Sequence, residues 1–411
     1  MNNIKKTSLL LGLLLFLVIT KSTAQVDFNI RTITAGITLE NLSDTLTLKE
    51  SIAFLEGARK AYEAAGYTVQ TIRISSQHLH ELLAGKADQT TIVQLQAIDQ
   101  ILVRHNVSMA MGELVEGDTF DPKLVTWFAK LIEQTANLNF SVPIASKALG
   151  VHDQSIELAA EICHVLAGIG AGGEANFRFT ASANVPSNIP FFPAAFHQGE
   201  RSFALGLESP KILSKVFAQS TLKNAAQNLR AALNQQMKPL EVIAEQLAVA
   251  KDWHYDGIDT SPAPGLEASI GEAIETLTGL PFGSPSTLRA CSIITGVLKN
   301  LEVKTCGYSG LMLPVIEDKV LAKRNIEGRF TIEELLLYST VSGTGLDVVP
   351  IPGDTPKAVL AAIYADVAAL SLKYTNKALS VRLFPIPGKQ AGELVEFKNP
   401  YLTGSTIMKV H

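Results

Sequence analysis

LDVVPIPGD at residues 346–354 and VRLFPIPGK at residues 381–389 are near-copies of one pattern, and they decide the fold class. Each is a run of β-forming residues that stops at Pro-Ile-Pro-Gly. Proline cannot donate a hydrogen bond to a strand ladder, and glycine allows the chain to turn. The pattern therefore predicts two buried strands that end beside charged residues. A helix-like segment, residues 356–372, separates them, which predicts parallel pairing through a helical crossover.

The same alternation of strand and helix extends toward the N-terminus. Residues 28–37 alternate and are rich in β-branched side chains, and residues 48–65 repeat apolar side chains at helical spacing up to Gly66. We count about nine or ten such strand–helix units. No low-complexity linker divides them. The pattern predicts a single α/β domain over residues 25–411.

Four segments resemble the domain-of-unknown-function family 711, also called uncharacterised protein family 0210. They are NIRTITAGI at residues 29–37 and the segments 307–318, 345–355 and 378–389. The resemblance covers essentially the whole mature chain. It implies a closed barrel of about ten strands surrounded by helices, similar to that of pyruvate formate-lyase. It implies no established activity, and the Arg-Val-x-Gly-aromatic segment that stores the radical in glycyl-radical enzymes does not occur here.

The N-terminus reads as a secretory signal peptide. Lys5 and Lys6 precede the apolar run from Leu9 to Ile19, and small residues follow up to Ala24. The apolar run is shorter than the roughly 20 residues that span a bilayer, so cleavage after Ala24 is predicted, without a remaining membrane anchor. The expected location is the periplasm or the exterior of the cell.

Composition excludes some partners and chemistries. The chain has 35 Lys and Arg against 39 Asp and Glu, and the predicted signal segment removes only basic residues, so nucleic acid is not an expected partner. Three cysteines do not form a disulfide scaffold. Cys163 and Cys291 lie in helix-like apolar runs and are predicted to be core residues, and Cys306, at a strand entry, is also interpreted as structural.

A long segment rich in aromatic residues is the first candidate site. It follows the strand-like residues 176–183 and leads into His-Gln-Gly-Glu-Arg at 197–201. Long loops in compact domains are often functional. In a pocket, His197 and Glu200 can transfer protons while Arg178, Asn184 or Arg201 holds a carboxylate or phosphate. The alternative is a packed surface loop with a local Glu200–Arg201 ion pair.

The segment 252–264 is the second candidate. His254, Asp256 and Asp259 are types of residue that can hold a divalent cation. No metal signature is matched, and acidic residues at a solvated strand end need no ion to explain them. No cofactor is therefore predicted.

Charged residues near the two Pro-Ile-Pro-Gly strands form the third candidate. Asp347 and Arg382 lie within strands that otherwise read as buried, and an unpaired charge there is costly. They can form a structural ion pair, or they can face a substrate together with Tyr308, Asp354 and Lys377.

Two functions remain open. The first is an exported enzyme that acts on a small polar or anionic substrate by acid–base chemistry from His197, Glu200, Asp256 and Asp354. The alternative is a periplasmic protein that only binds its ligand, with an oligomeric state that the sequence does not predict. If all strands run in parallel, seven residues should meet at one end of the barrel: Arg178, Asn184, His197, Asp256, Asp347, Asp354 and Arg382.

Overall fold

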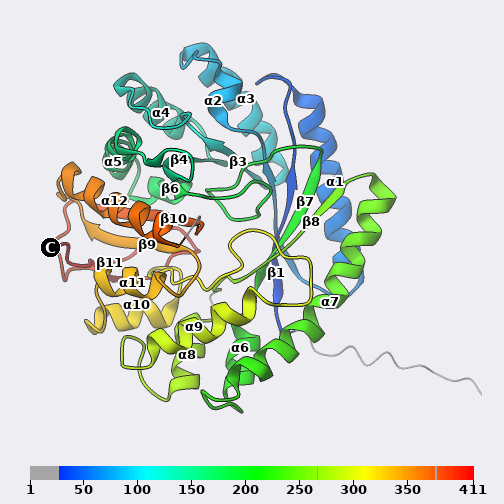
Figure 1. The fold of residues 1–411 in the computed structure, drawn as a ribbon. Coiled ribbons are helices and arrows are strands. Elements are labelled where there is room, and N and C mark those ends of the chain that lie inside the picture. The colour runs from blue at the N-terminus through cyan, green and yellow to red at the C-terminus, as the bar shows by residue number, and fades with distance from the viewer. Residues whose placement is uncertain (1–26, 266, 375–376) are drawn as a thin grey trace, which may run out of the picture.

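The computed structural model describes residues 27–265, 267–374 and 377–411. The predicted signal peptide lies outside these residues. Within them the chain forms one α/β unit in which helices surround a ten-stranded sheet (Figure 1). This confirms the predicted α/β class. No helix in the described ranges combines the length and apolar character that a membrane crossing needs.

The strands and helices alternate along most of the chain. The strands are β1 (Asn29–Gly36), β2 (Val69–Ser75), β3 (Val107–Glu113), β4 (Leu138–Ser146), β5 (Gly150–Val151), β6 (Phe179–Ala183), β7 (Ser202–Glu208), β8 (His254–Pro262), β9 (Gly345–Pro352), β10 (Leu379–Ile386), β11 (Leu394–Val395) and β12 (Ser405–Thr406). The helices are α1 (Thr45–Ala64), α2 (Leu79–Leu83), α3 (Gln89–His105), α4 (Pro122–Gln134), α5 (Asp153–Ala167), the 3-10 helix η1 (Glu174–Arg178), α6 (Pro210–Phe217), α7 (Ala225–Lys251), α8 (Ile270–Thr278), α9 (Thr287–Leu298), α10 (Lys319–Ile326), α11 (Ile332–Ser339) and α12 (Lys357–Lys373).

The sheet consists of two groups of parallel strands that run in opposite directions. Its order is β8-β7-β1-β2-β3-β4-β6-β10-β9, and β5 pairs with β4 off this path. β1 to β6 form a parallel group, apart from β5, but β7 is antiparallel to β1 and β10 is antiparallel to β6. The prediction that all strands run in parallel is therefore wrong. The chain reverses in the irregular segment 184–201, where no helix makes a crossover.

One segment contacts both outer strands of the sheet. An isolated parallel bridge joins Ile258 of β8 to Thr305, and another joins Pro314 to Asp347 of β9. Residues 305–314 thus lie beside both β8 and β9. These two strands are the edge strands of the regular sheet. Strands of the sheet and Met312 of this segment line the candidate site described below.

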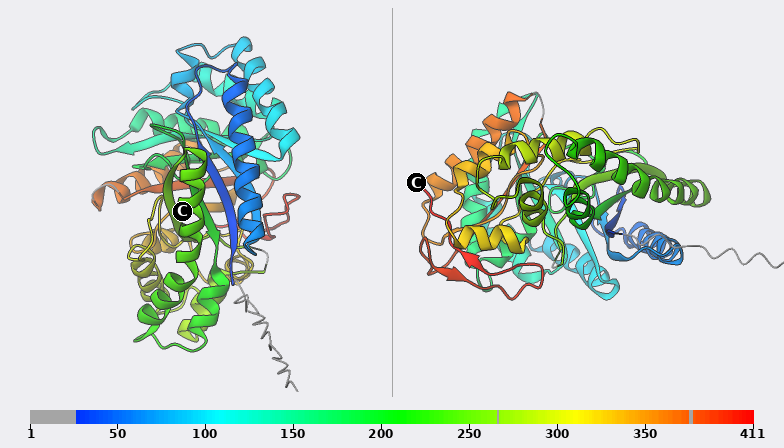
Figure 2. Two further views of the ribbon diagram at one scale, coloured as in Figure 1. Left: turned by 90° about the vertical axis from the view of Figure 1, so that its right-hand side faces the viewer. Right: turned by 90° about the horizontal axis from the view of Figure 1, so that it is seen from below.

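Burial on both faces explains the composition of the strands. Every residue of β7 and β10 is buried, which is typical of strands covered by helices on one side and by packed side chains on the other. Cys163 and Cys291 are fully buried, which confirms their prediction as core residues. The helices follow the outside of the sheet in all three views, and β11–β12 packs beside α10 (Figure 2).

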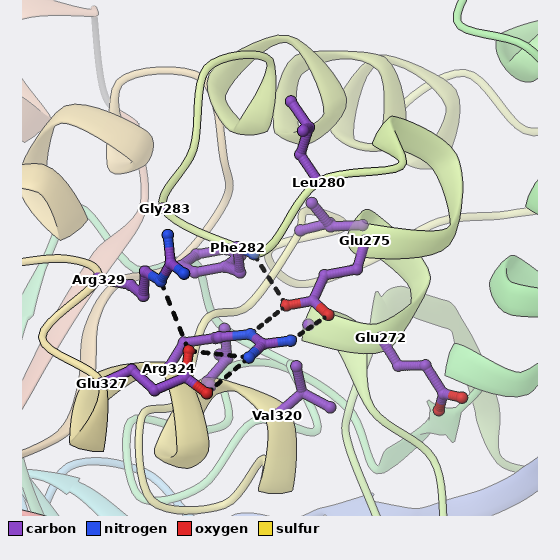
Figure 3. Close-up of polar contacts among 12 residues, drawn as sticks. Glu272, Glu275, Leu280, Phe282, Gly283, Val320, Arg324, Glu327 and Arg329 are labelled. Carbon is purple, nitrogen blue, oxygen red and sulfur yellow. Dashed lines mark hydrogen bonds and ion pairs between the residues drawn. The ribbon is translucent and has the colours of Figure 1, made fainter.

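An ion-pair cluster fastens α8 to α10 at the periphery (Figure 3). Arg324 donates to both carboxylate oxygens of Glu275, at 2.6 and 2.8 Å, and to Glu327 at 2.8 Å. Burial raises the pKa of Glu275, but the hydrogen bonds from Arg324 and from the Phe282 N–H outweigh it and leave the pKa lowered. This cluster is structural, because its charges neutralise one another.

Candidate functional site: an arginine-lined cavity inside the sheet

A cavity of about 170 Å³ lies between the two strand groups. Its wall includes Arg31 of β1, Arg73 of β2, Asp259 of β8 and Arg382 of β10, together with Glu317 from the segment after Pro314. These residues come from strands across the sheet, so the sheet curves around the cavity. We call it the arginine cavity, after Arg31, Arg73 and Arg382.

Arg382 is held by two carboxylates. Its Nε donates to Asp347 Oδ1 at 2.6 Å, and its Nη2 donates to Glu317 Oε2 at 2.9 Å. The side chains of Arg382 and Asp347 are only 5% and 1% exposed. Burial alone would lower the pKa of Arg382, but the two carboxylates raise it. The structure therefore confirms the predicted Asp347–Arg382 ion pair, and Arg382 is neutralised where it lines the cavity.

Glu317 is a titratable group at the cavity wall. Its side chain is 12% exposed. Burial raises its pKa above the usual value, and the nearby Asp347 adds to this, against the opposing effect of Arg382 and Arg31. A carboxyl group with a raised pKa keeps its proton to a higher pH than an ordinary glutamate does, which suits it to proton transfer. The sequence placed Glu317 near the third candidate, at the end of the segment 307–318, but predicted no role for it.

Arg73 and Arg31 have no carboxylate partner among the described residues. The Arg73 side chain makes no hydrogen bond to a described residue. Its guanidinium carbon lies 4.9 Å from the centre of the Phe192 ring. Burial lowers the pKa of Arg73 to about 9, and the neighbouring Arg31 contributes to this. Arg31 donates to Gln70 Oε1 at 3.2 Å and stacks over Tyr401. Two guanidinium groups thus line the cavity without forming an ion pair with a described carboxylate.

The long aromatic segment also contributes to this cavity. Pro190, Phe191 and Phe192 line it, which confirms that the loop following β6 forms part of a pocket. The Phe191 ring meets Tyr308 edge-on, with centroids 4.8 Å apart, and lies 5.9 Å from Arg382 Cζ. Tyr308 is thus placed beside the cavity wall, in the neighbourhood that the sequence predicted for it.

The His197 side chain does not line the arginine cavity. It is fully buried, and its Nε2 donates to the Gly199 carbonyl at 3.1 Å. Burial lowers its pKa, against the effect of this hydrogen bond. A side chain on Gly36 would overlap the imidazole, which explains the glycine at the end of β1. Asp256, by contrast, is half-buried, and its Oδ1 lies 3.8 Å from His254 Nε2.

Several other predicted residues make contacts that account for them without a ligand. Arg178 donates to the carbonyl groups of Leu138, Ile132 and Thr135, and Asn184 donates to Ser371 at 2.8 Å. Arg201 pairs with Asp252 at 2.9 Å, so the predicted Glu200–Arg201 pair is wrong. Lys377 donates to the carbonyls of Ser339 and Thr340, and the exposed Asp354 accepts from Gln390 at 2.9 Å.

The seven residues expected at one end are distributed over both ends and the middle of the sheet. Asn184 follows β6, and the starts of β9 and β10 lie beside the end of β6. Arg178 precedes β6 and Asp354 follows β9, so these two lie at the opposite end. Asp347 and Arg382 lie between the ends. The expectation failed because β7 to β10 run opposite to β1.

His254, Asp256 and Asp259 are not among the described groups whose ligand atoms lie within 4.8 Å of one another. Asp259 accepts hydrogen bonds from the backbone N–H groups of Ser261, Tyr308 and Ser309 at 3.0 to 3.2 Å. Both of its carboxylate oxygens are therefore already engaged by the protein. In the described part of the chain, a different triple has ligand atoms within 4.8 Å of one another: His78, His80 and Glu113. Burial lowers the pKa of His78 to about 4 and raises that of Glu113 to about 7. The only signal in the sequence was the His-Leu-His at 78–80.

Known proteins resemble the chain over nearly its whole length. The family described as "Uncharacterised ACR (DUF711)" matches residues 22–399. The UPF0210 protein of Pyrobaculum aerophilum is 28% identical over 91% of this chain and 89% of its own length. That of Carboxydothermus hydrogenoformans is 27% identical over 94% and 92%, and that of Methanocaldococcus jannaschii 25% over 94% and 91%. The resemblance inferred from residues 29–37 and 307–389 is confirmed, and the chain belongs to the DUF711 family.

Proposed function

We propose that this protein is an enzyme that binds a small anionic substrate in the arginine cavity and uses Glu317 for proton transfer. The observation that carries the proposal is Arg73, a half-buried side chain that lines the cavity and donates no hydrogen bond to a described residue. A carboxylate or phosphate group on the substrate would supply that acceptor. The cavity volume, about 170 Å³, is below the range of about 300–1,000 Å³ typical of pockets for drug-sized ligands, so the proposed substrate is a small metabolite.

Two of the three cavity arginines form no ion pair with a described carboxylate, which favours an anion beside them. Asp347 and Glu317 are engaged by Arg382, and Asp259 is held by backbone N–H groups. This leaves Arg31 and Arg73 as two positive groups next to one another. A unit negative charge about 4 Å from one guanidinium gains about 4 kcal/mol at an effective dielectric constant of about 20. Planar guanidinium groups also match the geometry of carboxylate and phosphate oxygens.

Glu317 supports a catalytic role over binding alone. Its carboxyl group, whose pKa is raised by burial, lies in the wall of the same cavity as the arginines, so a bound anion would lie next to a general acid or base. A non-catalytic binding protein remains the alternative, since arginines and aromatic rings also line the cavity. The proton-transfer roles predicted for His197, Glu200, Asp256 and Asp354 stay predictions, and none of the four is part of the described cavity wall.

The proposal extends to the closure of the sheet and to the location of the protein. The sheet and residues 305–314 together form a barrel of about ten strands around the cavity, supported by the bridges at Thr305 and Pro314. The protein is also exported, with cleavage after Ala24. The basic and apolar N-terminal pattern supports this, and the family match begins only at residue 22. N-terminal sequencing of the protein from its native host should find Gln25 first, and an intact Met1 would refute export.

The functional test compares Arg73→Gln with Arg104→Gln, which changes an exposed arginine on α3. Purified proteins are screened for thermal stabilisation by small carboxylates and phosphates. The wild type and the Arg104 variant should share at least one stabilising anion, and the Arg73 variant should lose it. An anion effect that is equal in all three proteins would contradict the proposed site.

Catalysis is tested with Glu317→Gln on the anions that bind. Conversion is followed by proton NMR, including exchange of carbon-bound hydrogens with deuterated solvent. The enzyme proposal predicts exchange or turnover by the wild type and its loss in the Glu317 variant, with binding retained. Binding without any exchange or turnover in the wild type would support the binding protein instead.

A further inference from the structure

A second cluster of chemically competent side chains lies away from the arginine cavity. His78 directly precedes α2, His80 lies in its first turn, and Glu113 is the last residue of β3. One ligand atom of each residue falls within 4.8 Å of the other two. The two imidazole rings are nearly parallel, with an interplanar angle of 14° and centroids 5.3 Å apart. His80 and Glu113 are partly exposed, so an ion can reach them from solvent.

The surroundings of this cluster are negative. The charged groups that act on His80 are the carboxylates of Glu81 and Glu116, and Glu81 also acts on Glu113. Neither the His80 imidazole nor the Glu113 carboxylate makes a hydrogen bond to another described residue, and the contact of Glu113 with His78 Nδ1 is 3.9 Å long. A half-buried carboxylate without a cation or donor is costly. A divalent cation would compensate it.

The position of His78 is fixed by packing. Phe196 covers its ring at a centroid distance of 4.2 Å. Gly112 has a φ of 58°, and a Cβ at that position would lie 2.6 Å from His78 Nδ1. The chain therefore carries glycine where a side chain would displace the imidazole. Such a held geometry lowers the cost of collecting ligands around an ion.

We propose that His78, His80 and Glu113 bind a divalent first-row transition metal ion such as Zn²⁺. Two imidazoles and one carboxylate suit such ions and leave coordination positions for water. His78 Nδ1 accepts a hydrogen bond from the Glu113 N–H at 3.0 Å. Ligation through this atom would replace that hydrogen bond with a metal bond. His80 and Glu113 would lose no side-chain hydrogen bond to a described residue on binding the ion.

The test uses the full chain without an affinity tag, treated with a chelator and then titrated with Zn²⁺ by calorimetry. The variants are His80→Ala and Glu113→Gln. The matched control is His105→Ala, which removes an exposed imidazole paired with Glu56 at 3.1 Å. Circular dichroism checks that each variant is folded.

The wild type and the His105 variant should bind one Zn²⁺ per chain, and each site variant should bind it more than about tenfold more weakly. Zn²⁺ should also raise the melting temperature of the wild type and not that of the His80 variant. Absence of binding by the wild type, or equal affinity in wild type and site variants, would overturn the metal site without bearing on the arginine cavity.

Discussion

Replacing Arg382 with methionine should destabilise the protein by about 3–5 kcal/mol, because it leaves buried carboxylates without their cation. Each lost hydrogen bond to a charged group contributes about 1.5–3 kcal/mol, and Arg382 makes two, to Asp347 and Glu317. Methionine keeps part of the apolar contact with Phe177. Glu317 can take up a proton when its cation is removed, which lowers the cost of burying it. The expected loss of stability is therefore smaller than the total of about 6 kcal/mol that two such hydrogen bonds contribute at most.

Urea denaturation followed by circular dichroism measures the loss. Arg201→Met is the control, because Arg201 and Asp252 form an ion pair of similar length whose side chains are 47% and 95% exposed. Such a pair contributes about 0–1 kcal/mol. A loss in the Arg382 variant no larger than that of the control would refute the reasoning that a buried ion pair is required inside the sheet.

The pH dependence of the Arg382 variant follows from Glu317. The pKa of Glu317 is already raised in the folded protein, and loss of the cation raises it further. The native state then binds more protons than the unfolded state, so stability is highest at acidic pH and falls as pH rises through the native pKa. The Arg382 variant should therefore lose more stability than the wild type between acidic and neutral pH. A parallel pH profile for both proteins would contradict this.

Three further predictions concern residues outside the cavity. Gly112→Ala should destabilise the protein more than Gly150→Ala in denaturant titrations, since both have positive φ but only Gly112 has an imidazole within overlap distance; equal losses would count against the packing around His78. Glu275→Gln should cost about 1–3 kcal/mol at neutral pH, and the difference from wild type should vanish as pH falls through the lowered native pKa of Glu275; a constant difference would contradict the ion pair with Arg324. The three cysteines should stay unreactive toward a thiol reagent at neutral pH until the protein unfolds, because burial raises all three thiol pKa values; rapid labelling of the native protein would refute this.

The strands that the sequence predicted best are those with local signals. The Pro-Ile-Pro-Gly repeats occur at the ends of β9 (Gly345–Pro352) and β10 (Leu379–Ile386), where proline and glycine act through their own backbone. The Asp347–Arg382 pair was one of two stated alternatives, because burial of charge limits the choices. The same reasoning correctly placed Cys163 and Cys291 in the core.

Long-range relations were not predictable from local patterns. The direction of β7 depends on how the chain reverses through residues 184–201, and no residue there specifies it. Arg31 and Arg73 lie on the paired strands β1 and β2, but Glu317 comes to the same cavity from a segment more than 240 residues further along the chain. His78 and Glu113 are 35 residues apart and meet because β2 and β3 are neighbours.

The most direct test of the arginine cavity is an anomalous diffraction measurement on crystals of the protein soaked in bromide. Bromide is a small anion that scatters anomalously and can enter a cavity of about 170 Å³. The account predicts an anomalous peak in contact with the Arg73 guanidinium in the wild type and its absence in Arg73→Gln crystals. Absence of bromide from the cavity in the wild type, with bromide only at surface lysines and arginines, would contradict the claim that Arg73 binds an anionic substrate.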